Sequence, residues 1–148
     1  PLSKLTGHIS YVPQNILILD DTLKNNIILN NEYDSELFSK VIKDSKLENF
    51  MHNLSEKQNT MIGERGSNIS GGQKQRIGLA RALYSKPKFL ILDESTNALD
   101  DETKKKIFET FHSLKGKVTM LIVTHNKENL YFCDKIINIK NKRIYNEI

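Results

Sequence analysis

Hydrophobic residues change their spacing along the chain, and each spacing predicts a different kind of element. Residues 7–14 alternate between apolar and polar side chains up to Pro13, which predicts a short strand that delivers Gln14 into a loop. Residues 89–92 and 118–123 are continuous apolar runs, which are typical of parallel strands covered on both faces. The pattern therefore predicts a parallel sheet whose strands lie far apart in the sequence.

Helical spacing of apolar residues dominates the stretch that follows the first strand. Residues 15–59 carry short apolar faces at this spacing, broken by Asn, Asp and Ser. Thr22 and Ser35 are the expected N-caps of the first two helices, because a hydroxyl oxygen can accept from free N–H groups at a helix start. Small amphipathic helices at this position predict a helical subdomain set into the core.

A longer helix is predicted over residues 71–83. Its apolar residues recur on one side, and the residues expected to face outward are Lys74, Gln75, Arg76 and Arg81. Pro87 follows shortly afterwards, and proline cannot continue a helix. The helix should therefore end just before the second strand.

A strand–helix–strand unit is predicted in the second half of the chain. Residues 102–114 have helical spacing, and Gly116 is placed as the C-cap. Together with the strands on either side, this helix predicts a right-handed βαβ crossover. The tail is expected to hold a short helix and two strands, at residues 128–132, 135–139 and 143–147.

The composition is that of a globular domain, with 27% charged and 38% hydrophobic residues. The net charge of +4 indicates a lysine-rich surface and no nucleic-acid partner, because no basic stripe alternates with aromatic residues. The single cysteine, Cys133, excludes an internal disulfide framework and is expected to be packed. No apolar run approaches the roughly 20 residues of a membrane-spanning helix. Since the chain begins at Pro1 without an initiator methionine, we expect a piece of a longer protein.

Two glycines stand at the expected start of the helix over residues 71–83. Ser70 and Gln73 have the spacing of a capping box, but this does not account for Gly71 and Gly72, since each glycine inside a helix costs about 1 kcal/mol relative to alanine. Glycines allow close approach to exposed N–H groups, where the helix dipole favours an anion. A bound phosphate is the favoured interpretation, and a plain capping box is the alternative.

Two adjacent acids, Asp93 and Glu94, follow the apolar strand at residues 89–92. Neighbours on a strand point to opposite faces, so one acid could hold hydrated Mg²⁺ while the other polarises a water toward phosphorus. His125 ends the next strand, and the carboxyl ends of parallel strands meet at one edge of the sheet. The alternative is a polar strand end and a structural histidine.

One expected part of a phosphate site has no counterpart in the sequence. A phosphate loop of the form G-x-x-x-x-G-K-[ST] needs a lysine after its second glycine. Gly66 and Gly71 have the spacing, but Gly72 follows them. The 148 residues therefore contain no phosphate-binding lysine loop.

With these residues together, the sequence resembles the nucleotide-binding domain of ABC transporters over essentially its whole length. The resemblance is to the exporter type, although Met61 stands where an acid is usual. The matching segments are Gln14 (Q-loop), residues 15–25 and 60–66 (exporter segments), residues 69–73 (signature loop, with Ile69 for the usual Leu), residues 89–94 (Walker B and catalytic Glu), residues 97–100 (D-loop, with Asn97 where Ser is common) and His125 (switch histidine).

The resemblance implies ATP and Mg²⁺ as cofactors, sandwiched in a head-to-tail dimer with a second nucleotide-binding domain. It also implies contact with transmembrane domains, at the cytoplasmic side of a membrane. By this resemblance Asp93 and Gln14 would serve the metal, and Gln14 would also link the metal site to the transport domains. Glu94 would be the general base, and His125 would contact the γ-phosphate. The residues that would serve the partner's ATP are Ser70, Gly71, Gly72 and Gln73, and Asp100 would belong to the nucleotide site.

The expected fold is an α/β, P-loop NTPase-like (RecA-like) parallel-sheet core with an inserted helical subdomain, its N-terminal part missing. Residues 1–14 and 84–148 would form the core portion and residues 15–83 the helical subdomain with the signature helix. In the family, Walker A and the adenine-stacking aromatic lie upstream, so this piece alone is expected not to turn over ATP. One alternative is a soluble ABC-type ATPase of DNA maintenance, which is disfavoured because such proteins usually carry a long coiled coil between the Q-loop and the signature loop. The other is a non-catalytic interaction module, which is disfavoured because Glu94 and His125 are both present.

Overall fold

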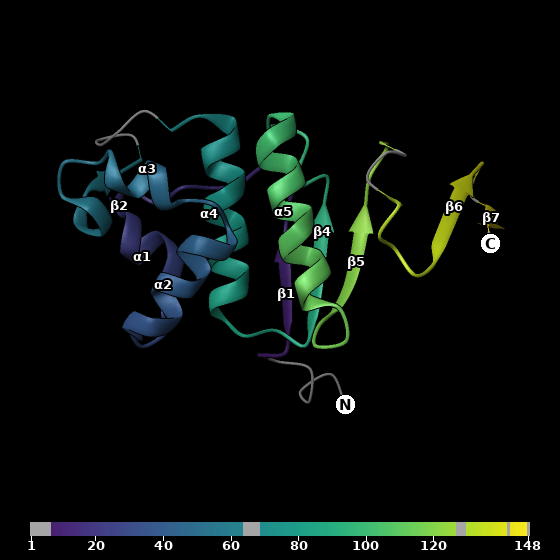
Figure 1. Ribbon diagram of the computed structural model, residues 1–148, viewed down its shortest axis with the longest axis horizontal. Coiled ribbons are helices and arrows are strands. Elements are labelled where there is room, and N and C mark those ends of the chain that lie inside the picture. The colour runs from purple at the N-terminus through teal and green to yellow at the C-terminus, as the bar shows by residue number, and fades with distance from the viewer. Residues whose placement is uncertain (1–6, 64–68, 127–129, 142, 148) are drawn as a thin grey trace.

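A parallel sheet of three strands, in the order β1-β4-β5, is the centre of the chain in its computed structural model (Figure 1). The parts of the chain that the structure describes are residues 7–63, 69–126, 130–141 and 143–147. The strands are β1 (Ile9–Val12), β4 (Phe89–Asp93) and β5 (Thr119–Val123). All three lie where the sequence predicts them, and the parallel α/β fold is confirmed.

The two faces of this sheet differ in burial. In register, Leu92 of β4 lies between Val12 and Ile122, and this face is packed against the helices. The opposite face carries apolar side chains that the described residues leave exposed. These are Ile9, Tyr11, Leu121 and Val123, with exposed fractions of 43%, 53%, 47% and 45%. The prediction that both faces are covered is therefore wrong for the described part of the chain: the strands are apolar on both sides, but one side is packed.

Helix α5 (Asp101–Leu114) makes the crossover from β4 to β5 and confirms the βαβ unit (Figure 1). Asp100 is its N-cap, since the carboxylate accepts from the backbone N–H of Thr103. Gly116 follows the C-cap with a φ of 76°, a left-handed conformation that favours glycine. Apolar residues of α5 such as Phe111 are buried in the same core as Leu92.

Short helices fill the stretch between β1 and the long helix. Thr22 caps the first of them, as predicted, by accepting from the N–H of Asn25. The second is capped by Asp34, and the prediction of Ser35 is wrong, because the Asp34 carboxylate accepts from the N–H groups of two following residues and the helix already begins at Ser35. The elements are α1 (Leu23–Ile28), α2 (Ser35–Asp44), α3 (Glu48–His52), the 3₁₀ turn η2 (Lys57–Asn59) and a small antiparallel pair, β2 (Asp21–Thr22) with β3 (Met61–Ile62).

The long helix α4 (Gly71–Tyr84) packs against α1, α2 and β1, and so joins the helices to the sheet (Figure 1). The prediction that its polar residues face outward holds for Lys74 and is wrong for the other three. Gln75 is only 5% exposed, and the half-buried Arg76 and Arg81 donate to backbone carbonyls of other elements. A polar side chain is stable in such a position because its hydrogen bonds are made inside the protein.

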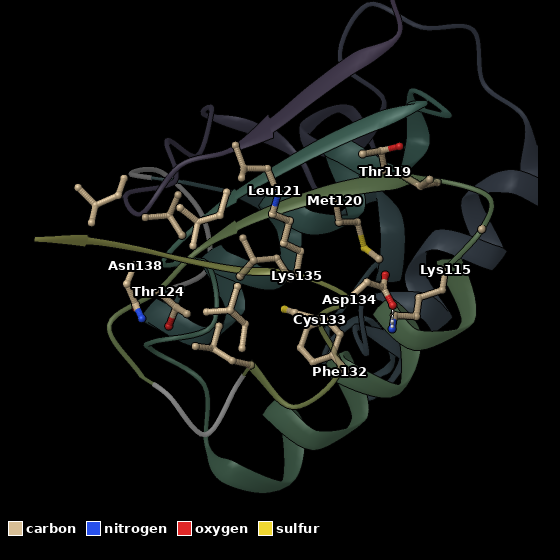
Figure 2. A pocket seen from close by; sticks show the side chains of 18 of the residues that line it. Lys115, Thr119, Met120, Leu121, Thr124, Phe132, Cys133, Asp134, Lys135 and Asn138 are labelled. Carbon is tan, nitrogen blue, oxygen red and sulfur yellow. Dashed lines mark hydrogen bonds and ion pairs between the residues drawn. The ribbon is translucent and has the colours of Figure 1, made fainter. Parts of the chain in front are cut away.

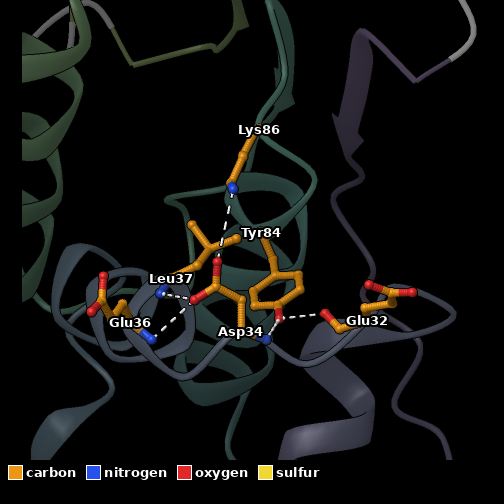
Figure 3. A network of polar contacts seen from close by, with 6 residues as sticks. All are labelled: Glu32, Asp34, Glu36, Leu37, Tyr84 and Lys86. Atoms are coloured by element: carbon orange, nitrogen blue, oxygen red, sulfur yellow. Dashed lines mark hydrogen bonds and ion pairs between the residues drawn. The ribbon is translucent and has the colours of Figure 1, made fainter.

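Tyr84, in the last turn of α4, anchors the start of α2 (Figure 3). Its hydroxyl donates to the carbonyl of Glu32 at 2.8 Å and accepts from the backbone N–H of Asp34 at 2.7 Å. The Nζ atom of Lys86 lies 3.9 Å from the Asp34 carboxylate. The cap of α2 is thereby attached to the end of α4.

The tail forms an antiparallel hairpin, as the sequence predicts. Its strands are β6 (Ile136–Lys140) and β7 (Arg143–Glu147), which lie beyond β5 in Figure 1. The short helix predicted over residues 128–132 falls partly on residues 127–129, which lie outside the described residues. None of the helices in the described ranges is long and apolar enough to cross a membrane.

Candidate functional site

Glu94 occupies the first position after β4 and has an unusual backbone. Its φ of 47° lies in the left-handed region, which costs about 1–2 kcal/mol for a residue with a side chain. Two backbone hydrogen bonds hold it there: its N–H donates to the carbonyl of Val123 at 3.0 Å, and its carbonyl accepts from the N–H of Asn97 at 3.1 Å. The sharp turn after β4 thus aims the Glu94 side chain at the edge of the sheet.

Three side chains from separate segments converge on the carboxylate of Glu94, whose side chain as a whole is only 14% exposed. The Nε2 of Gln14 donates to Oε2 at 2.7 Å, and the Nδ2 of Asn97 donates to the same oxygen at 3.0 Å. The Nε2 of His125 lies 2.8 Å from the other oxygen, Oε1. The structure therefore brings together Gln14, Glu94 and His125, the residues that follow β1, β4 and β5.

Asp93 lies beside this group but has different surroundings. It is paired in register with Val123, whose side chain is on the open face of the sheet. The hydroxyl of Tyr11 donates to Asp93 Oδ2 at 2.9 Å. This hydrogen bond and the negative charge of Asp93 raise the pKa of Tyr11, so the phenol stays protonated. Asp93 and Glu94 thus differ in their contacts, as the two-role interpretation requires.

The donor set at this edge is suited to Mg²⁺ with additional ligands. The described residues contain no group of three or more His, Cys, Asp and Glu side chains that would hold a metal alone. Mg²⁺ usually takes one or two carboxylates and completes its oxygen shell with water and phosphate oxygens. Asp93 offers a carboxylate, and Gln14 uses its amide nitrogen on Glu94, which leaves its amide oxygen outside that bond.

The start of α4 has the predicted capping box. The Ser70 hydroxyl accepts from the N–H of Gln73 at 3.2 Å, and the Gln73 side chain accepts from the N–H of Ser70 at 2.9 Å. The structure gives a packing reason for glycine at position 72, because a Cβ added there would meet the carbonyl oxygen of Ala98 at 3.0 Å. The loop after β4 therefore approaches the start of α4 closely.

Asp100 has a clear structural role at the start of α5. Its carboxylate accepts from the N–H of Thr103 at 2.9 Å, and this bond holds the pKa of Asp100 below its usual value, with the charge of Arg76 contributing. Its expected place at a nucleotide remains a prediction.

The sequence assigns no site role to Tyr11 or Gln75, and it indicates Asn97 only through the D-loop resemblance. In the structure Tyr11 contacts Asp93, and the Gln75 amide donates to the carbonyl of Glu94 at 3.4 Å. The contact of Tyr11 with Asp93 depends on the register of β1 against β4, which no local pattern fixes. Gln75 could have been found, since it lies four residues before the buried Leu79 and therefore on the same helical face.

A cavity of about 870 Å³ lies between β5 and the segment that leads into β6 (Figure 2). Met120, Phe132 and Cys133 point into it, and His125 lines it as well. Burial raises the pKa of the Cys133 thiol, which agrees with the expectation of a packed side chain. The cavity thus reaches the candidate site through His125.

The family model and the relatives that match this sequence all indicate an ABC transporter. The family model described as "ABC transporter" matches residues 1–97. ABC transporter C family member 6 of Dictyostelium discoideum is 41% identical over 145 residues, which cover 90% of this chain and 11% of that protein. The ATP-dependent lipid A-core flippase of Francisella tularensis subsp. tularensis (strain FSC 198) is 37% identical and matches 97% of this chain.

A solved structure agrees with these relatives. A bacterial Atm1-family ABC exporter with ATP bound has a TM-score of 0.89 and 28% sequence identity over 97% of this chain. The match covers 25% of that exporter chain and 24% of the flippase. The chain thus spans about a quarter or less of the length of the relatives described here.

Proposed function

The chain belongs to the ABC transporter family, and from this premise we propose that the protein containing it hydrolyses ATP to drive export of a substrate across a membrane. The residues described above would act at the cytoplasmic side of that membrane. The observation that carries the proposal is the convergence of Gln14, Asn97 and His125 on the Glu94 carboxylate.

Glu94 is the proposed general base. A carboxylate oxygen accepts about two hydrogen bonds. Among the described residues, Oε2 already has two donors, Gln14 and Asn97, whereas Oε1 has one, His125. A water molecule would therefore bind at Oε1 and give its proton to that oxygen as it attacks the γ-phosphate. His125, next to the same oxygen, would contact the γ-phosphate.

Asp93 and the amide oxygen of Gln14 are proposed to serve Mg²⁺, Asp93 through water. When bound, the ion would neutralise charge on the phosphate oxygens during phosphoryl transfer. Tyr11 keeps Asp93 in place by donating to one carboxylate oxygen, which leaves the other for a metal-bound water. Gln14 would connect this metal site to the transmembrane domains.

The start of α4 is proposed to serve a different ATP molecule, held in a head-to-tail dimer by a second nucleotide-binding domain. Ser70, Gly71, Gly72 and Gln73 lie in the first turn of a 14-residue helix, whose N-terminal dipole favours a phosphate. Asp100 would contribute near the same interface. We also propose the division into a core portion, residues 1–14 and 84–148, and a helical subdomain, residues 15–83, an arrangement supported by the grouping of α1–α4 beside β1 (Figure 1).

ATP hydrolysis by the full-length protein tests the proposal. Glu94→Gln is expected to lower kcat by about 100-fold or more, because the base is lost while the shape is kept, and to leave ATP binding in place. The matched control is Glu109→Gln, which changes an exposed glutamate on α5 and should keep wild-type activity. Wild-type kcat in Glu94→Gln would contradict the assignment.

We propose in addition that the 148 residues alone bind ATP weakly and do not hydrolyse it, since they contain no phosphate-binding lysine loop. Purified polypeptide of this length should show no Mg²⁺-dependent ATPase activity above background. Activity that disappears in Glu94→Gln would overturn this part of the proposal and leave the roles of the site residues standing.

A further inference from the structure

We propose that Gln75 is a positioning residue that couples the start of α4 to Glu94. This inference rests on the proposed function, because the start of α4 and Glu94 are there assigned to two different ATP molecules. Gln75 lies one turn into α4, and its side chain reaches across to the loop that follows β4. It would transmit the state of one nucleotide site to the other.

Both ends of the Gln75 amide are used. Its Oε1 accepts from the backbone N–H of Ala98 at 3.0 Å, and its Nε2 donates to the backbone carbonyl of Glu94 at 3.4 Å. The residue is only 5% exposed, so neither hydrogen bond competes strongly with water. The loop from residue 94 to residue 98 is therefore attached to α4 at each of its ends.

The first turn of α4 touches the same loop independently of Gln75. A Cβ on Gly72 would meet the carbonyl oxygen of Ala98 at 3.0 Å, and one on Gly71 would meet the Cβ of Ala98 at 3.4 Å. A backbone carbonyl cannot move aside as a flexible side chain can. The helix start is thus close enough to Ala98 that a shift toward the loop would displace Ala98, and Gln75 would pass this displacement on to Glu94.

The strained backbone of Glu94 makes this link consequential. A residue with a φ of 47° keeps its side-chain direction only while its backbone contacts hold it. Gln75 supplies one of those contacts, on the carbonyl that also accepts from the N–H of Asn97. Loss of the Gln75 amide should therefore misdirect the Glu94 carboxylate without touching any group that binds ATP.

The test uses the full-length protein with Gln75→Met, which keeps the length of the side chain and removes both hydrogen bonds. We expect kcat to fall about tenfold, equivalent to a barrier increase of about 1.4 kcal/mol, with KM for ATP within about twofold of wild type. Gln75→Glu keeps the acceptor for Ala98 but places a carboxylate oxygen against the Glu94 carbonyl in a buried position, so kcat should fall at least as far as in Gln75→Met. Gln58→Met, a glutamine outside the site that donates to Tyr33, is the control and should leave kcat unchanged.

An unchanged kcat in folded Gln75→Met, in a protein whose wild type hydrolyses ATP, would overturn this inference and leave the proposed function intact. Absence of wild-type hydrolysis would instead overturn the proposed function. If Gln75→Met does not fold, hydrogen exchange of the Glu94→Gln protein, in which Gln75 is intact, decides the matter. The Ala98 amide should exchange more slowly when ATP is added to the Glu94→Gln protein, and an unchanged rate would contradict the coupling.

Discussion

Glu94 is a strained residue whose neighbours fix the direction of its side chain. Its left-handed backbone is offset by hydrogen bonds to Val123 and Asn97, and its carboxylate is oriented by side chains from the ends of two other strands. Backbone strain of this kind persists only where the surroundings over-determine the conformation, and it clusters at functional sites. The candidate base is thus positioned before any substrate arrives.

Asp100 gives the first prediction at the scale of single residues. Asp100→Ala removes the N-cap of α5 and should lower the thermal midpoint of unfolding, whereas Asp100→Asn retains a capping oxygen and should change it much less. The pKa of Asp100 is lower in the folded state than in the unfolded state. The ionised carboxylate therefore stabilises the folded protein at pH values above the ordinary pKa of aspartate. This stabilisation is lost as the pH falls through the lowered pKa.

Thermal unfolding between pH 7 and pH 2 measures this effect. The difference between wild type and Asp100→Asn should shrink at the acidic end of the range, because the asparagine cap carries no charge at any pH. A constant difference across the whole range would show that the Asp100 charge contributes nothing to stability.

At the scale of elements, α4 contacts both the loop that follows β4 and the segment that follows Gln14. Gln75, Gly78 and Arg81 lie three residues apart and so on neighbouring positions of one side of the helix. Gln75 contacts the loop after β4, and Arg81 donates to the carbonyl of Leu17 in the segment that follows Gln14. One helix face thus contacts the segments that follow two of the three central strands.

Gly78 gives the prediction at this scale, because a Cβ added there would meet the Ile16 side chain, with Cγ1 at 2.8 Å. Gly78→Ala gains about 1 kcal/mol of helix propensity but should lose about 1–3 kcal/mol to overpacking. In an Ile16→Ala background the clash is gone, and the same change should be stabilising by about 1 kcal/mol. Chemical denaturation of the four proteins in this cycle gives the coupling, and additive effects would contradict the contact.

Elements and their edges were predictable from local patterns, whereas long-range contacts were not. The three strands, the capping box of Ser70 and the shared edge of His125 with the acid pair follow from hydrophobic pattern, cap spacing and the rule that parallel strands end at one edge. Gln14 is assigned to that edge only through the family resemblance. The choice of Asp34 over Ser35 depends on a one-residue shift of a helix start, which no periodicity resolves.

The contacts of Gln75 illustrate the remaining limit. Its polar character suggested the surface, but burial was decided by the loop that packs over it, 19 residues further along the chain at Glu94 and 23 at Ala98. Hydrophobic pattern describes which side of a helix is apolar, and it does not identify a polar residue whose partners are backbone groups from another segment.

At the scale of the whole molecule, the helices and one face of the sheet share a single hydrophobic core. Residues of α1, α4, β4 and α5 all belong to it, so the helices α1–α4 are continuous in packing with the strands. The other face of the sheet and the cavity beside β5 stay accessible in the described part of the chain, and both are largely apolar. The molecule therefore has one well-packed side and one open side.

The open side gives the last prediction: the 148-residue polypeptide, produced alone, should self-associate through it. Leu121 and Val123 of β5 are 47% and 45% exposed, on the same face as Ile9 and Tyr11 of β1, with the β4 residues of that face between them. Exposed apolar surface of this kind promotes association. Threonine is β-branched and favourable in strands, so replacing Leu121 and Val123 with threonine removes apolar area without disfavouring the strand. The double variant should weaken association by about tenfold or more, since a fully buried side chain of this size contributes about 1.5–3 kcal/mol.

Leu17→Thr is the matched control, because Leu17 is 74% exposed but lies outside the sheet. Sedimentation velocity over a range of concentrations measures self-association, and binding of an apolar dye measures exposed apolar surface. We expect wild type and Leu17→Thr to form concentration-dependent oligomers that bind dye, and the double variant to be mainly monomeric with weaker binding. Equal association in all three proteins would contradict the prediction that copies associate through the open face of the sheet. The contacts between copies would then come from other exposed apolar residues, such as Ile139 and Ile144 of the β6–β7 hairpin, which are 74% and 69% exposed.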